Sequence, residues 1–240
     1  MHLLECQKLV KIYNGRRVVD EATFGVDSGE IVGLLGPNGA GKTTSFRMAI
    51  GMIRPNSGRV LFKGQEITRL PMYRRARLGM GYLSQEPSLF QRLSVRDNLM
   101  AILETRDLSR AERRRRLAEL LREFDLERVA DNMAHSLSGG ERRRLEIARA
   151  LVTDPHIFLL DEPFSGIDPK MIADIQKILH SLKARGMSLL LTDHNVRDTL
   201  KVTDRAYIID QGRIVAHGSP EEIVEHPEVR SRYLGHEFTM

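Results

Sequence analysis

The stretch Gly36-Pro37-Asn38-Gly39-Ala40-Gly41-Lys42-Thr43 determines how the rest of the chain is interpreted. It ends an apolar run from Glu30 to Gly36 that is typical of a buried strand, and it opens a helical pattern from about Gly41 to Met52. Glycines let such a turn curl until successive backbone N–H groups converge on phosphate oxygens, and the helix N-terminus adds its positive dipole end. The sequence therefore predicts a nucleotide-phosphate cradle, with Lys42 on the β- and γ-phosphates and Thr43 on Mg²⁺.

A pair of acids follows a second apolar run. Asp161 and Glu162 come directly after Ile157 to Leu160, so both emerge at the carboxyl end of a strand, where open α/β sheets bind ligands. Asp161 is the expected Mg²⁺ partner, and Glu162 can orient the water that attacks the γ-phosphate or accept its proton. Alone, such a pair is also typical of a solvated turn. Together with the cradle it indicates a hydrolysis site.

The overall pattern places these elements in one α/β domain. The chain has 240 residues, 41% of them hydrophobic, which is enough for a single domain with a sizeable core. Strand-like runs alternate with turn signals over the first 30 residues and predict an antiparallel β patch. Apolar runs at 156–161, 188–193 and 206–210, separated by a helical pattern at 170–183, predict a parallel sheet.

Two further segments have a helical pattern. Residues 87–152 are Arg-rich and lack a convincing strand, and residues 220–240 resemble a helical tail. We therefore predict an α/β P-loop NTPase core over about 1–86 and 153–219, carrying the antiparallel β patch. A helical subdomain, about 87–152, is inserted into that core.

Composition indicates where the chain works. Charges or breakers interrupt every apolar run before the roughly 18 residues that a membrane-spanning helix needs. The start Met1-His2-Leu3-Leu4-Glu5 has an acid where a signal peptide needs a basic residue, and the single Cys6 has no disulfide partner within the chain. We expect a cytoplasmic protein that does not itself span a bilayer.

The charge balance permits an anionic partner without naming one. The formal net charge is +5, and the densest basic run, Arg113 to Arg116, lies in an amphipathic helical pattern that Ser109 and Glu112 open as a capping box. Consecutive helical positions turn by about 100° each, so these arginines cannot all face one phosphate backbone. They are interpreted as a solvated face, and no nucleic-acid partner is expected.

The stretch Leu137-Ser138-Gly139-Gly140-Glu141, 20 residues before Asp161, resembles the signature motif of ATP-binding-cassette (ABC) ATPases. With the cradle and the acid pair, it identifies the chain as a member of that family over nearly its whole length. The resemblance implies ATP and Mg²⁺ as ligands. It also implies a catalytic Glu162, a switch histidine at His194, and a glutamine, Gln85, that links the two subdomains.

The resemblance gives each matching position a role. Tyr13 is similar to the aromatic that stacks on adenine, although a tyrosine near a strand end is also typical of packing. Asp168 is similar to the aspartate of the dimer loop. The catalytic residues are then Glu162, His194 and Gln85, and the metal-binding residues Thr43, Gln85 and Asp161. The nucleotide-binding residues are Tyr13, Gly36, Pro37, Asn38, Gly39, Ala40, Gly41, Lys42, Thr43 and Thr44.

The signature also has a physical interpretation. Ser138 and Glu141 form a predicted capping box, which leaves backbone donors near Gly139 and Gly140 at a positive helix end that can bind an anion. In the family these four residues complete the partner subunit's site, which implies an ATP-dependent head-to-tail homodimer. Two positions depart from the family pattern. Glu141 replaces a frequent glutamine and adds a charge near the γ-phosphate, and Gly166 replaces a frequent alanine, which bears on the stiffness of the dimer loop.

A cassette without membrane spans implies separate transmembrane subunits, two per dimer, that insert a coupling helix into a groove. The segment after Gln85 fits the part of the family that receives this helix, with Leu89, Phe90 and Arg92 as docking candidates. Leu89 and Phe90 fit equally well as core of the helical subdomain. Through these partners we expect peripheral association with the cytoplasmic face of the inner membrane.

Several stretches resemble a narrower group, the ATPases of lipopolysaccharide export transporters, in which the ATP cycle extracts lipopolysaccharide from the inner membrane. They are 74–79, 81–85, 93–100, 138–151, 192–200 and 233–238. Cassettes for branched-chain amino-acid import share much of the pattern and stand as the alternative. A soluble cassette of DNA repair or translation would need a long coiled-coil insertion or a tandem cassette, and the sequence has neither.

Overall fold

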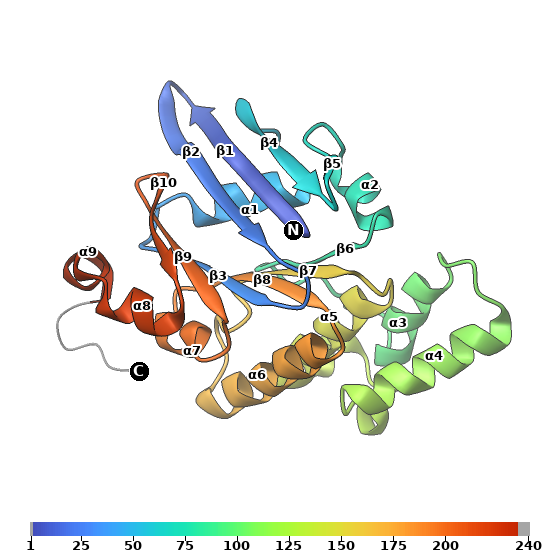
Figure 1. Ribbon diagram of the computed structural model, residues 1–240. Coiled ribbons are helices and arrows are strands. Elements are labelled where there is room, and N and C mark those ends of the chain that lie inside the picture. The colour runs from blue at the N-terminus through green and yellow to red at the C-terminus, as the bar shows by residue number, and fades with distance from the viewer. Residues whose placement is uncertain (1, 235–240) are drawn as a thin grey trace.

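Residues 2–234 are described by a computed structural model, in which the strands form two sheets (Figure 1). The first sheet is antiparallel, in the order β2-β1-β4-β5, and consists of β1 (Leu4–Tyr13), β2 (Arg16–Val26), β4 (Ser57–Phe62) and β5 (Gln65–Glu66). Asn14 and Gly15 join β1 to β2 with φ of 47° and 79°, the left-handed conformations that a tight hairpin turn requires. The predicted antiparallel patch is confirmed, and β4 and β5, which were not predicted, extend it.

The second sheet has the order β10-β9-β3-β8-β7-β6 and is parallel except for β10, which pairs antiparallel with β9. Its strands are β3 (Ile31–Leu35), β6 (Met80–Leu83), β7 (Ile157–Asp161), β8 (Ser188–Thr192), β9 (Arg205–Asp210) and β10 (Arg213–Gly218). Strands β3, β7 and β8 are buried along their whole length, which explains their unbroken apolar runs. The sequence did not reveal β6 and β10, which are short or half-exposed.

Nine α-helices complete the described chain. They are α1 (Lys42–Ile50), α2 (Met72–Arg77), α3 (Val95–Leu103), α4 (Arg110–Glu123), α5 (Gly139–Leu151), α6 (Pro169–Ala184), α7 (Val196–Leu200), α8 (Pro220–Glu225) and α9 (Pro227–Val229). Two short 3₁₀ turns lie at Glu127–Val129 and Ala134–Ser136, and Arg230–Leu234 forms a wider turn. The helices expected after the cradle and at 170–183 are present as α1 and α6.

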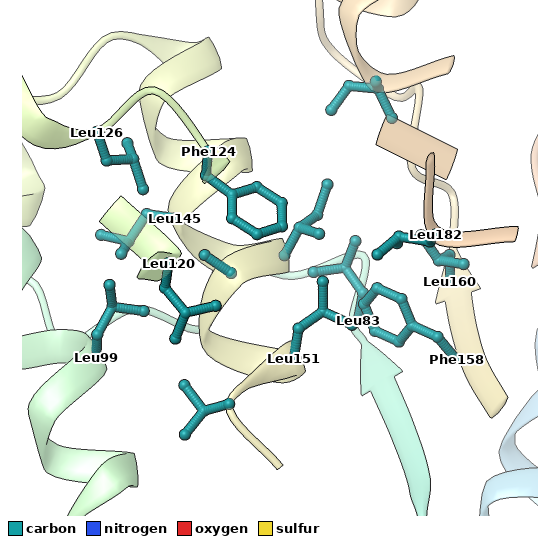
Figure 2. Packing of buried hydrophobic residues seen from close by; sticks show 14 of the residues in the cluster. Leu83, Leu99, Leu120, Phe124, Leu126, Leu145, Leu151, Phe158, Leu160 and Leu182 are labelled. Atoms are coloured by element: carbon teal, nitrogen blue, oxygen red, sulfur yellow. The ribbon is translucent and has the colours of Figure 1, made fainter. Parts of the chain in front are cut away.

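Helices α3, α4 and α5 supply the helical content expected over 87–152, while the division into subdomains at those boundaries stays a prediction. Leucine and phenylalanine side chains from α4, α5, β6 and β7 form one buried cluster (Figure 2). Within it, Leu120 of α4 and Phe124, the residue after α4, pack with Leu145 and Leu151 of α5. Helix α5 therefore belongs to the helical segment and to the sheet core at once, so its N-terminus is held relative to β7.

A second cluster joins the two sheets through α1. Phe46, Met48 and Ile50 of α1 are fully buried among side chains from β1, β2 and β4 on one side and β3, β7 and β8 on the other. A third cluster packs α8 and α9 against Leu35, the last residue of β3. Helix α8 begins at Pro220, in the segment predicted as a helical tail, and residues 235–240 of that segment lie outside the described part.

The arginine run lies on α4, which begins with the predicted capping box between Ser109 and Glu112. Arg114 and Arg115 are exposed, and Arg116 forms an ion pair of 2.7 Å with Asp154. These positions fit a solvated helix face. In the described part of the chain, no helix combines the length and apolar character that a bilayer crossing requires.

Candidate active site

The loop from Gly36 to Gly41 has a shape that two of its glycines make possible. Gly36 has φ 154°, and a Cβ there would lie 2.0 Å from the backbone oxygen of Ile209. Gly41 has φ 108°, and its Cβ would lie 2.8 Å from the backbone oxygen of Val18. Both contacts are closer than a side chain tolerates, so glycine is required for the loop to run this close to β9 and β2.

Helix α1 begins with its backbone donors free of a side-chain cap, because its N-cap residue is Gly41. Lys42, the first residue of α1, is 6% exposed and folds back to donate to the carbonyl oxygens of Gly36 and Pro37, at 2.6 and 2.9 Å. Burial lowers the pKa of Lys42, although the carboxylates of Glu162, Asp193 and Asp161 oppose that shift. A bound phosphate would replace the two neutral carbonyl oxygens as the partner of the Lys42 ammonium. Because an anion is a stronger partner for this cation than a carbonyl, the arrangement can bind phosphate.

A hollow of about 640 Å³ opens beside the loop at Gly39 and is lined by Arg16, Arg17, Val18 and Gln211. Tyr13, at the end of β1, is 45% exposed, and the ammonium of Lys11 lies 5.2 Å from its ring centre. An exposed aromatic ring can stack on a base. Sequence reasoning named Tyr13 but missed the two arginines, which are ordinary charges on a hairpin until the fold sets them beside Gly39.

The two acids occupy different environments. Asp161 is 1% exposed; its Oδ2 accepts a hydrogen bond of 3.4 Å from Tyr82, and its Oδ1 has no hydrogen-bond partner among the described residues. Burial, with a smaller contribution from the charge of Glu162, raises the pKa of Asp161 to about 6. A buried carboxylate oxygen without a donor is open to a cation, which is the observation that fits Mg²⁺ here.

Two other residues predicted to be catalytic lie close to the carboxylate of Glu162. The Gln85 amide donates to Glu162 Oε2 at 2.9 Å, and His194 Nδ1 lies 3.4 Å from the same oxygen. Glu162 has a left-handed backbone, φ 49°, which turns its side chain away from that of the preceding Asp161. The structure therefore brings Gln85, Glu162 and His194 together from three separate stretches of sequence.

Asp193 is a buried acid in this cluster that sequence reasoning did not single out. Its carboxylate accepts hydrogen bonds from the backbone N–H of Phe164 at 2.8 Å and of Asn195 at 2.9 Å, and it lies 3.4 Å from His194 Nδ1. These bonds join the loop after β7 to the loop after β8, and burial raises the pKa of Asp193. The only sequence signal was its place at the end of an apolar strand, one residue before His194.

A buried ion pair was also missed. Arg143 and Glu146 of α5 are 8% and 6% exposed, and the distance from Arg143 Nη1 to Glu146 Oε2 is 2.9 Å. The Arg143 guanidinium also donates to the carbonyl oxygens of Glu162 at 3.1 Å, Pro163 at 3.3 Å and Ser84 at 3.4 Å. The loop that bears Glu162 is thus fixed to α5 and to the residue before Gln85.

The signature residues open α5 as predicted. Ser138 and Glu141 form the capping box, with 2.9 Å from the Ser138 N–H to Glu141 Oε2, and this bonding lowers the pKa of Glu141. In residues 2–234 the hydrogen bonds of Ser138 stay within this turn and do not reach the cradle. A Cβ on Gly140 would lie 1.9 Å from Met171 of α6, so the two helix N-termini pack closely.

Asp168, predicted to be the aspartate of the dimer loop, caps α6, and its carboxylate accepts from the Met171 N–H at 3.0 Å. Gly166, one of the two departures from the family pattern, has φ 72° and open space around its Cα. Glycine suits this left-handed conformation, which alanine would strain.

Comparison with known proteins identifies this arrangement. The family model described as ABC transporter matches residues 19–165, which include the cradle, the signature and both acids. The chain belongs to the ABC transporter family. A second model, described as branched-chain amino acid ATP-binding cassette transporter, matches residues 213–239.

Individual relatives match the cassette over its full length. It is 52% identical to the lipopolysaccharide export system ATP-binding protein LptB of Escherichia coli (strain K12), with 100% of both chains covered. It is 53% identical to the protein of the same name from Acidithiobacillus ferridurans, with 98% of each chain covered. Among solved structures, the ADP conformation of an ATP-binding cassette of an ABC transporter matches with a TM-score of 0.88 at 26% identity, covering 98% of this chain and 99% of that one. The ABC ATPase fold expected from the sequence is confirmed.

The docking candidates separate into exposed and buried residues. Phe90 is 47% exposed, with the guanidinium of Arg149 5.3 Å from its ring centre, and Arg92 is exposed. Leu89 is 7% exposed and belongs to the helical core cluster, which favours the packing alternative for this residue, while its docking role stays a prediction. Neighbouring positions in this loop face opposite sides, which a motif match without a structure does not reveal.

A hollow of about 340 Å³, here called the α2–α5 hollow, lies next to Phe90. Its wall includes Met72 and Ala76 of α2, Tyr82 of β6, Phe90, and Arg149 and Ala150 of α5. Apolar side chains beside a guanidinium can receive an amphipathic helix.

Proposed function

We propose that this chain is the ATP-hydrolysing subunit of a transporter that exports lipopolysaccharide from the inner membrane. The observation that carries the proposal is the 52% identity, over the full length of both chains, to a protein named for that export system. The cradle, the acid pair and the signature lie within residues 19–165, which match the ABC transporter model, and they support the proposal.

In the proposed reaction, ATP binds with its phosphates on the Gly36–Thr44 loop and the N-terminus of α1. Lys42 leaves the carbonyl oxygens of Gly36 and Pro37 and turns to the β- and γ-phosphates. Tyr13 stacks on the adenine. The positive charge of Lys42 and the uncapped N–H groups of α1 then stabilise negative charge that develops on the γ-phosphoryl oxygens.

Glu162 is the proposed general base. Its side chain is only 17% exposed, and Gln85 and His194 both lie at its Oε2, so it can orient one water for in-line attack and take its proton. His194, 55% exposed, can swing to the γ-phosphate when nucleotide is present.

Three oxygen-bearing side chains would hold Mg²⁺: the Thr43 hydroxyl, the Gln85 amide and the Asp161 carboxylate. Oxygen donors are what this ion prefers, and Asp161 Oδ1 is free to bind. When bound, the ion neutralises charge on the β- and γ-phosphates.

The signature would act on a second copy of the chain. We propose that Ser138, Gly139, Gly140 and Glu141 meet the γ-phosphate held by the partner's cradle, with Asp168 beside it, so that ATP closes a homodimer. Ser138 now uses its hydroxyl to cap α5, and this hydroxyl is exposed enough to exchange that bond for a phosphate oxygen.

Docking to two transmembrane subunits would use the α2–α5 hollow with Phe90 and Arg92. An inserted coupling helix would meet apolar wall residues and the guanidinium of Arg149. The chain would then work at the cytoplasmic face of the inner membrane through these partners, with the lipid handled by them.

The alternative is the ATPase of a branched-chain amino-acid importer, which the match of residues 213–239 to that family's model favours. The matched stretch is the C-terminal segment alone. The full-length identity to export-system proteins outweighs it, because it includes the stretches around the docking candidates. Nothing specific favours a soluble cassette of DNA repair or translation.

Co-purification tests the proposal. The tagged chain, expressed in its own source and extracted from membranes with detergent, should carry two membrane subunits identified by mass spectrometry. Vesicles containing that complex and lipopolysaccharide should release lipid to an acceptor only with ATP, and the complex carrying Lys42→Ala should release none. Recovery of amino-acid permease subunits, or of nucleic acid that stays bound at high salt, would overturn the export assignment.

A further inference from the structure

Tyr82 connects the acid pair with the α2–α5 hollow. It lies in β6 and pairs with Leu159 of the neighbouring strand β7, two residues before Asp161. Because side chains alternate along a strand, Leu159 and Asp161 share one face of the sheet. Tyr82 packs on the edge of the same cluster as Leu159, so its hydroxyl reaches Asp161 across the sheet surface.

The hydroxyl of Tyr82 forms a hydrogen bond with one carboxylate oxygen of Asp161, and the other oxygen has no such bond among the described residues. It donates to Oδ2 at 3.4 Å, while Oδ1 is buried without a hydrogen-bond partner among residues 2–234. The phenol is the donor of this bond, because an ionised carboxylate oxygen can only accept. A buried carboxylate held by one oxygen has a defined rotamer, with its free oxygen in a defined direction.

Tyr82 lines the α2–α5 hollow together with Ala76, Phe90 and Arg149. The same residue thus borders a surface hollow and donates a hydrogen bond to Asp161. A ring is rigid, so any displacement at the hollow moves the oxygen that holds Asp161.

We propose that Tyr82 is a positioning residue that orients Asp161 for Mg²⁺ and connects the occupant of the α2–α5 hollow with the metal-binding side of the active site. The inference rests on the proposed function in two respects, the assignment of Asp161 to the Mg²⁺ shell and the docking of a coupling helix in the α2–α5 hollow. It adds a second connection to the one that Gln85 makes with Glu162.

Tyr82→Phe tests the orientation because it removes the hydroxyl and keeps the ring. Tyr73→Phe is the matched control, since Tyr73 is 56% exposed on α2 and its hydroxyl accepts from Arg74 rather than contacting Asp161. Both changes are made in full-length Glu162→Gln protein, and Mn²⁺ binding to the ATP-loaded protein is titrated by electron paramagnetic resonance. ATP affinity in EDTA is measured in parallel.

We expect Tyr82→Phe to raise the Kd for Mn²⁺ roughly three- to tenfold, the loss of one hydrogen bond to a charged group, with metal-free ATP affinity unchanged. A Kd within 1.5-fold (roughly 0.2 kcal/mol) of the Tyr73→Phe control would overturn the orienting role. Asp161→Asn distinguishes failure of the proposed metal role of Asp161 from failure of the orienting role of Tyr82. If it does not weaken Mn²⁺ binding, the proposed metal role of Asp161 fails; if it does and Tyr82→Phe does not, only the inference about Tyr82 fails.

The connection to the hollow is tested by filling it. Ala76→Trp places a large ring in the hollow, and we expect it to shift the Mn²⁺ Kd at least about twofold in protein with Tyr82 but not in Tyr82→Phe protein. No shift in either, or equal shifts in both, would overturn the connection.

Discussion

The side-chain amide of Gln85 donates a hydrogen bond of 2.9 Å to the Glu162 carboxylate, joining the segment after β6 to the acid after β7. Residues at these two positions are far apart in sequence, yet the parallel order of β6 and β7 brings the ends of both strands to one edge of the sheet. This bond links the segment that leads to Phe90 with the proposed general base.

Gln85→Ala should slow ATP hydrolysis about tenfold, because Glu162 loses the donor that holds its Oε2. ATP affinity in EDTA should not change. Phosphate release under saturating ATP and Mg²⁺ measures the effect. The control is Gln91→Ala, whose side chain is exposed and whose backbone carbonyl bond to His135 survives the change. Equal turnover in the two variants would remove Gln85 from the site.

Lys42→Ala should weaken ATP binding by a factor of 100 or more, corresponding to roughly 3 kcal/mol, since the phosphates lose their main cation in a buried loop. Equilibrium dialysis with labelled ATP gives the affinity. Lys177→Ala, on the exposed surface of α6, is the matched control and should bind normally. Retention of ATP affinity by a folded Lys42→Ala protein would contradict the cradle.

Removing the charge of Asp161 should stabilise the protein in EDTA at neutral pH. Burial raises the pKa of this group from its usual 3.8 to about 6, so the folded state binds a proton more tightly than the unfolded state. Stability contributed by that proton is present below pH 4 and is lost as the pH rises through 6. Asp161→Asn should thus gain about 2 kcal/mol in free energy of unfolding between pH 4 and pH 7, relative to the unmodified protein. A pH-independent difference in urea denaturation would contradict this account.

Breaking the Arg143–Glu146 pair should lower the stability of the protein, because one of the two buried charges is then left without a partner. Arg143→Met leaves Glu146 as a buried, uncompensated charge and should lower the free energy of unfolding by about 3 kcal/mol. The double variant Arg143→Met/Glu146→Leu should recover most of that loss. If the single variant unfolds within about 0.5 kcal/mol of the unmodified protein, the pair is not a fixed buried contact.

The sequence predicted those parts of the site whose chemistry is local. The glycine loop, the acid pair at the end of β7, and the capping boxes at Ser109 and Ser138 each need only a few neighbouring residues, and each is present. Residues that act across elements were missed. Arg143 is one of several arginines on α5 until the packing of that helix on β7 directs it to the carbonyl oxygen of Glu162.

The different environments of Leu89 and Phe90 could not be predicted for the same reason. The two residues share one sequence neighbourhood, and only the fold shows that Leu89 enters the helical core while Phe90 remains at the surface. Tyr82 likewise lies in a four-residue strand whose pattern is too short to read, and its relation to Asp161 depends on the register of β6 against β7.

The most direct test of the central claim is the hydrolysis rate of purified Glu162→Gln protein under saturating ATP and Mg²⁺. Glutamine keeps the shape of the side chain but cannot accept a proton, so ATP should bind with unchanged affinity, turnover should fall about 100-fold or more, and the chain should dimerise on ATP. Residual hydrolysis close to that of the unmodified protein would contradict the assignment of Glu162 as the general base, and with it the chemistry derived for this site.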